Sequence, residues 1–249
     1  MSPTQNVDPV QAVRLAVVVP LANEEDTVDE FMRRLQLQLA ISDRVYCILD
    51  NASRDSTRER VENFASTDRR FACIWAPEDR SVVEAYFRGY REALASGALW
   101  ILEMDGGLSH SPEEIPRFVA AMEAGSDFAG GSRFIKGASW SGPPGRFVVS
   151  RGGTVLANTL LGTSMRDMTS GFECFSRPAL QLVLDHGVQS RAHFFQTEIR
   201  YLMHRLKWVE VPITYQSPSN RLGTSTLQDA LRSLRSLRQE HVRSRREAR

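Results

Sequence analysis

The sequence predicts an α/β protein whose mainly parallel sheet is flanked by helices. Continuously apolar runs rich in β-branched residues, typical of strands covered on both faces, recur through the first 132 residues. Between them lie segments whose apolar residues recur every three or four positions, as they do in amphipathic helices. Strands separated by helices of ten or more residues form right-handed βαβ units, so we expect the strands to pair in parallel.

Five strands with helices between them are expected in this part of the chain. The first strand is the run Leu-Ala-Val-Val-Val at 15–19, which Pro20 is expected to end. A helix then opens at 23–26, with apolar residues at 28, 31, 32, 35 and 39. The other strands are expected at 45–49, 71–75, 99–103 and 127–132, and the other helices around 61–64, at 82–94 and at 111–122.

The pattern changes after Arg133, where helices and irregular segments dominate. Residues 137–145 are rich in Gly, Ser and Pro and predict a mobile loop. We expect helices at 148–161, 178–184 and 192–206, a short strand or turn at 168–175 and a strand at 208–215. The predicted organisation is a flexible tail at 1–13, one domain at 14–225 with halves meeting at 133/134, and an Arg-rich amphipathic helix at 226–249.

Composition narrows the class of protein. Lys and Arg number 31 against 30 Asp and Glu, so net charge favours neither nucleic acid nor an anionic membrane. The three cysteines lie far apart, without metal-ligand spacing or disulfide parity, and favour a reducing cytoplasm. No apolar run approaches 18 residues and no secretory signal is present, so we expect a cytoplasmic protein that does not span a membrane. The sequence leaves open whether the protein attaches peripherally to the cytoplasmic face of the membrane and whether it forms a homo-oligomer.

Two predicted strands each end in an acidic residue. Asp50 follows the second strand and Asp105 the fourth. The carboxyl ends of parallel strands share one edge of the sheet, where open α/β sheets bind ligands. Gly106 and Gly107 let a bulky group approach the backbone closely. The structural alternative is a simple strand-to-helix turn, with Ser111 as the N-cap.

An ordered set of motifs carries a family resemblance across roughly residues 14–227. The motifs are Val17–Glu24, Leu49–Thr57, Met104–His110, Gly130–Phe134, Ser150–Gly152, Asp167–Phe172, Phe195–Glu198 and Glu210–Tyr215. In this set the chain resembles the family 2 glycosyltransferases of GT-A fold, and within them the dolichyl-phosphate mannose synthase-like branch. The resemblance implies inverting transfer of a sugar from a GDP- or UDP-linked donor to a polyprenyl or dolichyl phosphate. It also implies a Rossmann-like core, to which the spacing of the leucines at 226–249 adds a predicted C-terminal helical extension.

The resemblance assigns candidate roles residue by residue. The nucleotide-sugar site would contain Pro20, Ala22, Glu24, Asp50, Ser53, Asp105 and Gly106. Arg133, Arg151, Ser170 and Arg221 would contact phosphate or acceptor, since guanidinium forks suit phosphate oxygens. The catalytic candidates are Asp105, Asp167 and Glu198. Asp105 would also bind Mg²⁺ or Mn²⁺, which would act as a Lewis acid on the departing diphosphate.

The sequence departs from the family pattern at positions that bear on the metal and the acceptor. Gly107 stands where the second Asp of the Asp-x-Asp motif belongs, and Ser109 where a Gln is often found. Asp105 is then nearly the only oxygen ligand that the motif offers, so metal affinity without nucleotide should be weak. The alternative is that arginines, without a metal, stabilise the charge of the departing diphosphate. The Gly-x-Ser-Lys-Leu motif has become Gly-Thr-Ser-Thr-Leu at 223–227 and has lost its lysine.

Three functional readings therefore stay open. A polyprenyl phosphate acceptor needs no strong base because its attacking oxygen is already anionic. A soluble sugar or natural-product hydroxyl needs a carboxylate base, for which Asp167 and Glu198 are the candidates, although Glu198 would alternatively pair with an arginine such as Arg200. The third reading is a nucleotide-sugar-binding pseudoenzyme. The segment 226–249 either lies on a membrane interface or packs on the domain or another subunit.

Overall fold

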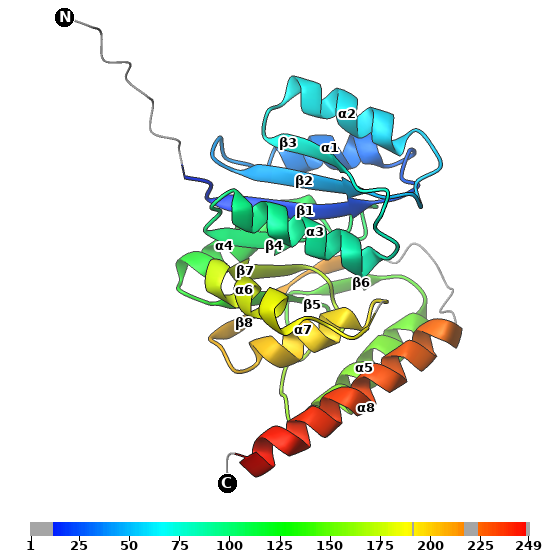
Figure 1. Ribbon diagram of the computed structural model, residues 1–249, viewed down its shortest axis with the longest axis vertical. Coiled ribbons are helices and arrows are strands. Elements are labelled where there is room, and N and C mark those ends of the chain that lie inside the picture. The colour runs from blue at the N-terminus through cyan, green and yellow to red at the C-terminus, as the bar shows by residue number, and fades with distance from the viewer. Residues whose placement is uncertain (1–11, 191, 217–223, 248–249) are drawn as a thin grey trace, which may run out of the picture.

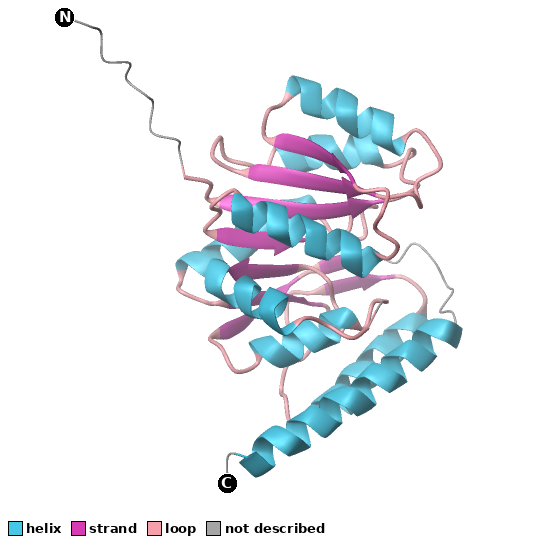
Figure 2. Ribbon diagram, in the orientation of Figure 1, coloured by secondary structure: helices cyan, strands magenta, loops and turns pink. Residues whose placement is uncertain are grey.

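A seven-stranded sheet forms the centre of the described part of the chain, with helices on both faces (Figure 1) (Figure 2). The computed structural model describes residues 12–190, 192–216 and 224–247. The strand order is β3-β2-β1-β4-β7-β5-β8. The strands are β1 (Leu15–Leu21), β2 (Arg44–Leu49), β3 (Phe71–Trp75), β4 (Trp100–Glu103), β5 (Phe128–Ser132), β7 (Glu173–Ser176) and β8 (Trp208–Pro212).

The sheet is mainly parallel, as the sequence predicts. β1 pairs in parallel with both β2 and β4, and β5 pairs in parallel with β8. β7 is antiparallel and lies between β4 and β5. The chain order reverses at β1, so the ends of β2 and β4 flank the end of β1, as at the switch point where open α/β sheets bind ligands.

Helices cover the sheet on both faces because its central strands are apolar on both sides. Leu15, Val17 and Val19 of β1 pack into one core, whereas Ala16 and Val18 pack into the other. The first core is covered by α1 (Val28–Gln36), α2 (Thr57–Thr67) and α4 (Ile115–Glu123), which a 3-10 turn η1 (Pro112–Glu114) precedes. The second is covered by α3 (Val82–Ala95), α6 (Arg177–His186) and α7 (Phe195–Met203).

Two boundaries in the first half differ from the prediction. Pro20 does not end the first strand: it pairs with Ile48 inside β1, which continues to Leu21. A proline near the end of a strand forfeits only one ladder hydrogen bond, so the strand tolerates it there. The helix predicted to reach residue 39 ends at Gln36.

The second half contains strand pairings that the sequence did not predict. In the described residues, β6 (Ser139–Ser141) and β9 (Thr214–Gln216) form a second, two-stranded parallel sheet. The segment predicted as a loop at 137–145 therefore contains a strand. The single strand predicted at 208–215 is divided into β8 and β9 at Ile213, whose N–H donates to Ser132 and whose carbonyl accepts from Ser139. The chain thus leaves the large sheet after Pro212 and joins the small one.

Two long helices lie side by side at one end of the molecule (Figure 1). They are α5 (Pro144–Leu161) and α8 (Thr224–Glu247). Leu234 and Leu237 of α8 are buried, and Tyr201 in α7 makes a hydrogen bond of 3.1 Å with His241. The described part of the C-terminal segment therefore packs on the domain, which is one of the two predicted arrangements. None of the helices in the described residues has the length and apolar character needed to cross a bilayer.

Candidate active site

A cleft of about 910 Å³ opens at the carboxyl ends of β1, β2 and β4. Its lining combines residues from both halves of the predicted domain. Among the predicted site residues that the structure describes, those lining the cleft are Pro20, Ala22, Glu24, Asp50, Asp105, Gly106, Arg133 and Ser170. Arg221 lies outside the described residues, as does most of the predicted tail at 1–13.

Asp50 and Asp105 share this cleft, so the prediction that both lie at one edge of the sheet is confirmed. Asp50 directly follows β2, and its carboxylate accepts a 2.8 Å hydrogen bond from the N–H of Ala52, which shapes the turn. Asp105 follows β4 by two residues, and its side chain is 43% exposed. The geometry leaves both carboxylates accessible to a ligand that spans the end of β1.

Two neighbours hold Asp105 in position. The hydroxyl of the buried Tyr86 donates to Oδ1 at 3.0 Å, and the backbone N–H of Asp105 donates to Nδ1 of His110 at 3.1 Å. Burial lowers the pKa of His110, whose ring stacks on Phe172 with centroids 4.9 Å apart. His110 is therefore neutral with its proton on Nε2, and its 3.9 Å approach to Asp105 is no ion pair. The sequence offered no signal for Tyr86, since an aromatic residue on a helix face resembles ordinary core.

The glycine turn after Asp105 is tight. A Cβ at Gly106 would lie 2.1 Å from Cδ2 of Leu21, so any larger residue would force the Leu21 side chain to move. Leu108 has a positive φ of 60°, a conformation that costs a non-glycine residue of order 1–3 kcal/mol. Strain of this kind is common where a turn is held for a ligand.

Glu24 enters the cleft on the loop after β1. Its backbone N–H donates to Oγ1 of Thr57 at 2.8 Å, and Oγ1 of Thr27 donates to its Oε2 at 2.8 Å. Asn23 adopts the left-handed conformation, with φ of 58°, that Asn tolerates well. Burial raises the pKa of Glu24, and the negative charge of Asp105 raises it further.

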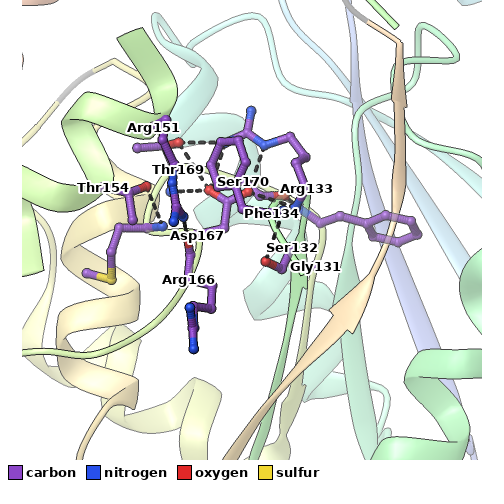
Figure 3. Close-up of polar contacts among 12 residues, drawn as sticks. Gly131, Ser132, Arg133, Phe134, Arg151, Thr154, Arg166, Asp167, Thr169 and Ser170 are labelled. Carbon is purple, nitrogen blue, oxygen red and sulfur yellow. Dashed lines mark hydrogen bonds and ion pairs between the residues drawn. The ribbon is translucent and has the colours of Figure 1, made fainter. Parts of the chain in front are cut away.

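Arg133 and Asp167 form a buried ion pair beside the cleft (Figure 3). Nε and Nη2 of Arg133 donate to the two carboxylate oxygens at 2.7 and 2.8 Å, and Nη2 also donates to Oγ1 of Thr169 at 2.5 Å. Burial acts to raise the pKa of Asp167, but the charge and hydrogen bonds of Arg133, together with the charge of Arg200, outweigh it and the pKa lies below its ordinary value. Asp167 is therefore an ionised carboxylate with both oxygens occupied. This pairing favours a positioning role, and its predicted role as a general base stays a prediction.

Aromatic rings surround the guanidinium of Arg133. Its carbon lies 5.3 Å from the ring centre of Phe134, 5.7 Å from that of Trp140 and 5.2 Å from that of Tyr215. Cations placed over ring faces at such distances are attracted to them. The side chain is only 5% exposed, so Arg133 is held rigidly where it lines the cleft.

Arg200 connects the segment Asp167–Ser170 to the sheet. It is fully buried and donates to Oε1 of Glu173 at 2.6 Å. It also donates to the backbone carbonyls of Asp167, Gly131 and Ser170. The sequence suggests Arg200 only as a partner of Glu198, because the closeness of α7 to β7 is visible only in the fold.

Two buried carboxyl groups face each other across β4 and β7. Glu103 and Glu173 are register partners, and both are fully buried. Oε1 of Glu103 and Oε2 of Glu173 lack a hydrogen-bond partner in the described residues, while Tyr90 donates to the other oxygen of Glu103. Burial raises the pKa of Glu173 to about 7 against the opposing effect of Arg200, and raises that of Glu103 well above its usual range. Because burial disfavours charge on both groups, we expect the pair to retain a proton near neutral pH.

Besides Asp167, three predicted site residues in the described part of the chain do not line the cleft. Glu198 is 3% exposed and accepts from the backbone N–H groups of Gln189 at 2.6 Å and Ser190 at 2.9 Å. Ser53 donates to a neighbouring carboxylate at 3.3 Å within the turn after β2. Arg151 donates to a backbone carbonyl at 2.9 Å. Their assigned roles stay predictions, and contacts within the protein account for the positions seen here.

One side of the cleft is apolar. It is lined by Val149 and Leu156 of α5, by Phe194 just before α7 and by Leu234 of α8. Arg146, also on α5, lines the cleft too. No sequence motif predicts this wall, because it depends on α5 and α8 meeting beside the phosphate-binding candidates.

The family model described as Glycosyl transferase family 2 matches residues 16–184, which is more than half of the chain. The chain belongs to glycosyl transferase family 2. The family and the enzyme class expected from the motifs are thereby confirmed.

Curated relatives of this family 2 glycosyltransferase extend over most of its length. The polyprenol monophosphomannose synthase of Mycolicibacterium smegmatis is 29% identical over 220 residues, covering 86% of this chain and 81% of the relative. The undecaprenyl-phosphate mannosyltransferase of Micrococcus luteus is 28% identical over 208 residues, covering 82% and 84%. The dolichol-phosphate mannosyltransferase of Pyrococcus furiosus is 28% identical, and 56% of its length is covered.

Solved structures support the GT-A fold. Glucosyl-3-phosphoglycerate synthase from Mycobacterium tuberculosis, in complex with Mn²⁺, UDP-glucose and phosphoglyceric acid, superposes with a TM-score of 0.67. The superposition covers 96% of this glycosyltransferase and 85% of that chain at 16% identity. At this identity the likeness shows the fold alone. The predicted Rossmann-like architecture is confirmed.

Proposed function

We propose that this enzyme transfers a sugar, with inversion, from a GDP- or UDP-linked donor to a polyprenyl phosphate. The observation that carries the proposal is the single cleft, which joins the carboxylates at the strand ends to Arg133 and then to an apolar wall. These three parts of the cleft suit, in the same order, a nucleotide, a phosphate and an isoprenoid chain. The names of the polyprenyl-phosphate mannosyltransferase relatives support the acceptor class.

The donor would bind over the ends of β1, β2 and β4. Asp50 would accept an N–H of the base, and Gly106 would let the donor approach the backbone closely. The rest of the proposed nucleotide-sugar site consists of Pro20, Ala22, Glu24, Ser53 and Asp105.

The acceptor phosphate would bind near Arg133, with Ser170, Arg151 and Arg221 as further proposed contacts. Arg133 is preorganised by Asp167 and the surrounding rings, so it would bind an anion with little loss of side-chain freedom. An anionic phosphate oxygen would attack the anomeric carbon as the bond to the nucleoside diphosphate breaks. Such an acceptor carries no proton to remove, which agrees with the burial of Asp167 and Glu198.

The residues present fit a divalent cation of the Mg²⁺ or Mn²⁺ type. The described residues hold no group of three or more His, Cys, Asp or Glu side chains suited to a metal. The carboxylate of Asp105 is nevertheless accessible, and that of Glu24 occupies the space beside Gly107, so two hard oxygen donors face the cleft. A bound cation would neutralise charge on the departing diphosphate. If no cation binds, Arg133 is the candidate for that stabilisation.

We also propose that α5 and α8 contact an anionic membrane surface. Val148 and Val155 of α5 are 66% and 56% exposed, and Arg235 and Arg238 of α8 are exposed. Exposed apolar side chains on one helix and arginines on the helix packed against it suit the headgroup boundary. Serine at both valines should weaken sedimentation with phosphatidylglycerol vesicles, whereas Leu182→Ser, at an exposed apolar site on α6, should not. Equal sedimentation of both variants would contradict the proposal.

The function is tested by incubating the purified protein with labelled GDP- and UDP-sugars and undecaprenyl phosphate, then extracting with organic solvent. Labelled lipid is expected, and Asp105→Asn should reduce its formation at least about 100-fold. Asp26→Asn, which changes an exposed acid outside the cleft, is the matched control. Product confined to the aqueous phase would indicate a soluble acceptor. Donor binding with neither transfer nor hydrolysis would indicate a pseudoenzyme.

A further inference from the structure

The space beside Asp105 at Gly107 is occupied by a carboxylate from another part of the chain. A Cβ built at Gly107 would lie 2.7 Å from Oε1 and 2.9 Å from Oε2 of Glu24. The loop after β1 therefore delivers an acid to the place that a side chain at 107 would fill. Position 107 is two residues after Asp105, where the sequence lacks the second acid of the motif.

Glu24 is positioned by contacts that leave one of its oxygens available. Its backbone is tied to Thr57, whose hydroxyl in turn donates to Asp55 at 2.6 Å. Thr27 orients the carboxylate through Oε2. No hydrogen bond within the described part of the chain reaches Oε1. The carboxylate is thus held in place while Oε1 keeps its lone pairs available to a cation.

The two carboxylates repel each other in the absence of a positive partner. Both side chains line the same cleft. Tyr86 occupies Oδ1 of Asp105, while Oδ2 lies 3.9 Å from a neutral His110. A cation between the acids would relieve this repulsion and use oxygens that the protein does not otherwise satisfy.

We propose that Glu24 supplies the second carboxylate ligand of a divalent cation held with Asp105, in place of the acid missing at position 107. The proposal rests on the proposed function, because diphosphate oxygens and water would complete the coordination. Two carboxylates plus substrate phosphates are a common ligand set for Mg²⁺. This role differs from the nucleoside contact that the family resemblance implies for Glu24.

The test measures Mn²⁺ binding by electron paramagnetic resonance in the presence of GDP or UDP, and nucleotide affinity by calorimetry without metal. Glu24→Gln should weaken Mn²⁺ binding at least about tenfold and have a much smaller effect on metal-free nucleotide affinity. Gly107→Ala should weaken Mn²⁺ binding as well, because its Cβ displaces the carboxylate. The double variant Glu24→Ala/Gly107→Asp should recover most of the affinity by moving the acid to position 107. Glu25→Gln, at an exposed neighbour, is the control.

The outcomes separate this proposal from the proposed function. If Glu24→Gln weakens metal-free nucleotide binding and leaves Mn²⁺ affinity unchanged, Glu24 is a nucleoside contact and the proposal is wrong. If the wild-type protein forms labelled lipid without binding Mn²⁺, the proposal is also wrong while the proposed function stands. If it binds neither nucleotide nor Mn²⁺, both fail. Melting curves recorded on every variant ensure that each comparison is made on folded protein.

Discussion

The buried pair Glu103 and Glu173 should make the stability of this protein fall as pH rises. Glutamine at position 103 keeps the shape of the side chain and offers an amide N–H to the unpartnered oxygen of Glu173. Glu173, which already accepts from Arg200, would then ionise with no need to retain a proton. We therefore expect Glu103→Gln to remove most of the pH dependence that the pair confers.

The magnitude follows from the pKa of Glu173. Its pKa is raised from 4.5 to about 7 in the folded protein, so the folded state binds more protons than the unfolded state between these values. The free energy of unfolding therefore decreases as pH rises through this window, by on the order of 3 kcal/mol. For a chain of this size, that corresponds to about 6–12 °C in the melting temperature.

The assay compares melting temperatures of the wild-type protein and Glu103→Gln from pH 5 to pH 8. As pH increases, the melting temperature of the variant should rise relative to that of the wild-type protein, and at pH 8 the variant should be the more stable of the two. Glu113→Gln is the control. Because Arg34 lowers the pKa of Glu113 to about 2, this substitution should lower the melting temperature by a similar amount at pH 5 and at pH 8. A constant difference between the wild-type protein and Glu103→Gln across the range would refute the retained-proton account.

Two further substitutions test the architecture of the cleft. Asp167→Asn leaves Arg133 buried without its partner and should reduce the free energy of unfolding, measured in urea, by about 3–5 kcal/mol. Adding Arg133→Met to this variant should restore most of the lost stability. A stable Asp167→Asn protein that has lost turnover would instead favour a general base. Gly106→Ala places a Cβ 2.1 Å from Leu21 and should cost about 1–3 kcal/mol. The effect should be less than additive with Leu21→Ala, and strict additivity would contradict this packing.

The end of the cleft proposed to bind the nucleotide was largely predictable from sequence. Apolar β-branched runs alternating with amphipathic helices dictate a parallel sheet, and parallel strands bring Asp50 and Asp105 to one edge. These inferences depend on local periodicity and on a general topological rule. They fail only in detail, as at Pro20, where the local signal for a strand end is overridden by pairing with β2.

The end of the cleft proposed to bind the acceptor was not predictable, because it depends on contacts between distant segments. Nothing in the segment around Glu173 predicts that β7 inserts between β4 and β5, because a four-residue strand carries too little periodicity to specify its neighbours. The pairing of Arg133 with Asp167 spans 34 residues, and a side chain's partner is chosen by the fold rather than by spacing.

By itself, the sequence determined the fold class, the family and the edge of the sheet where a nucleotide sugar would bind, because these follow from periodicity and ordered motifs. Only the tertiary structure decided which acids are exposed and which are buried. Asp105 faces the cleft, Asp167 neutralises Arg133, and Glu24 fills the space that Gly107 leaves empty. The physical reason is that burial and charge pairing set the chemistry of a carboxylate, and both arise from residues far away in the chain.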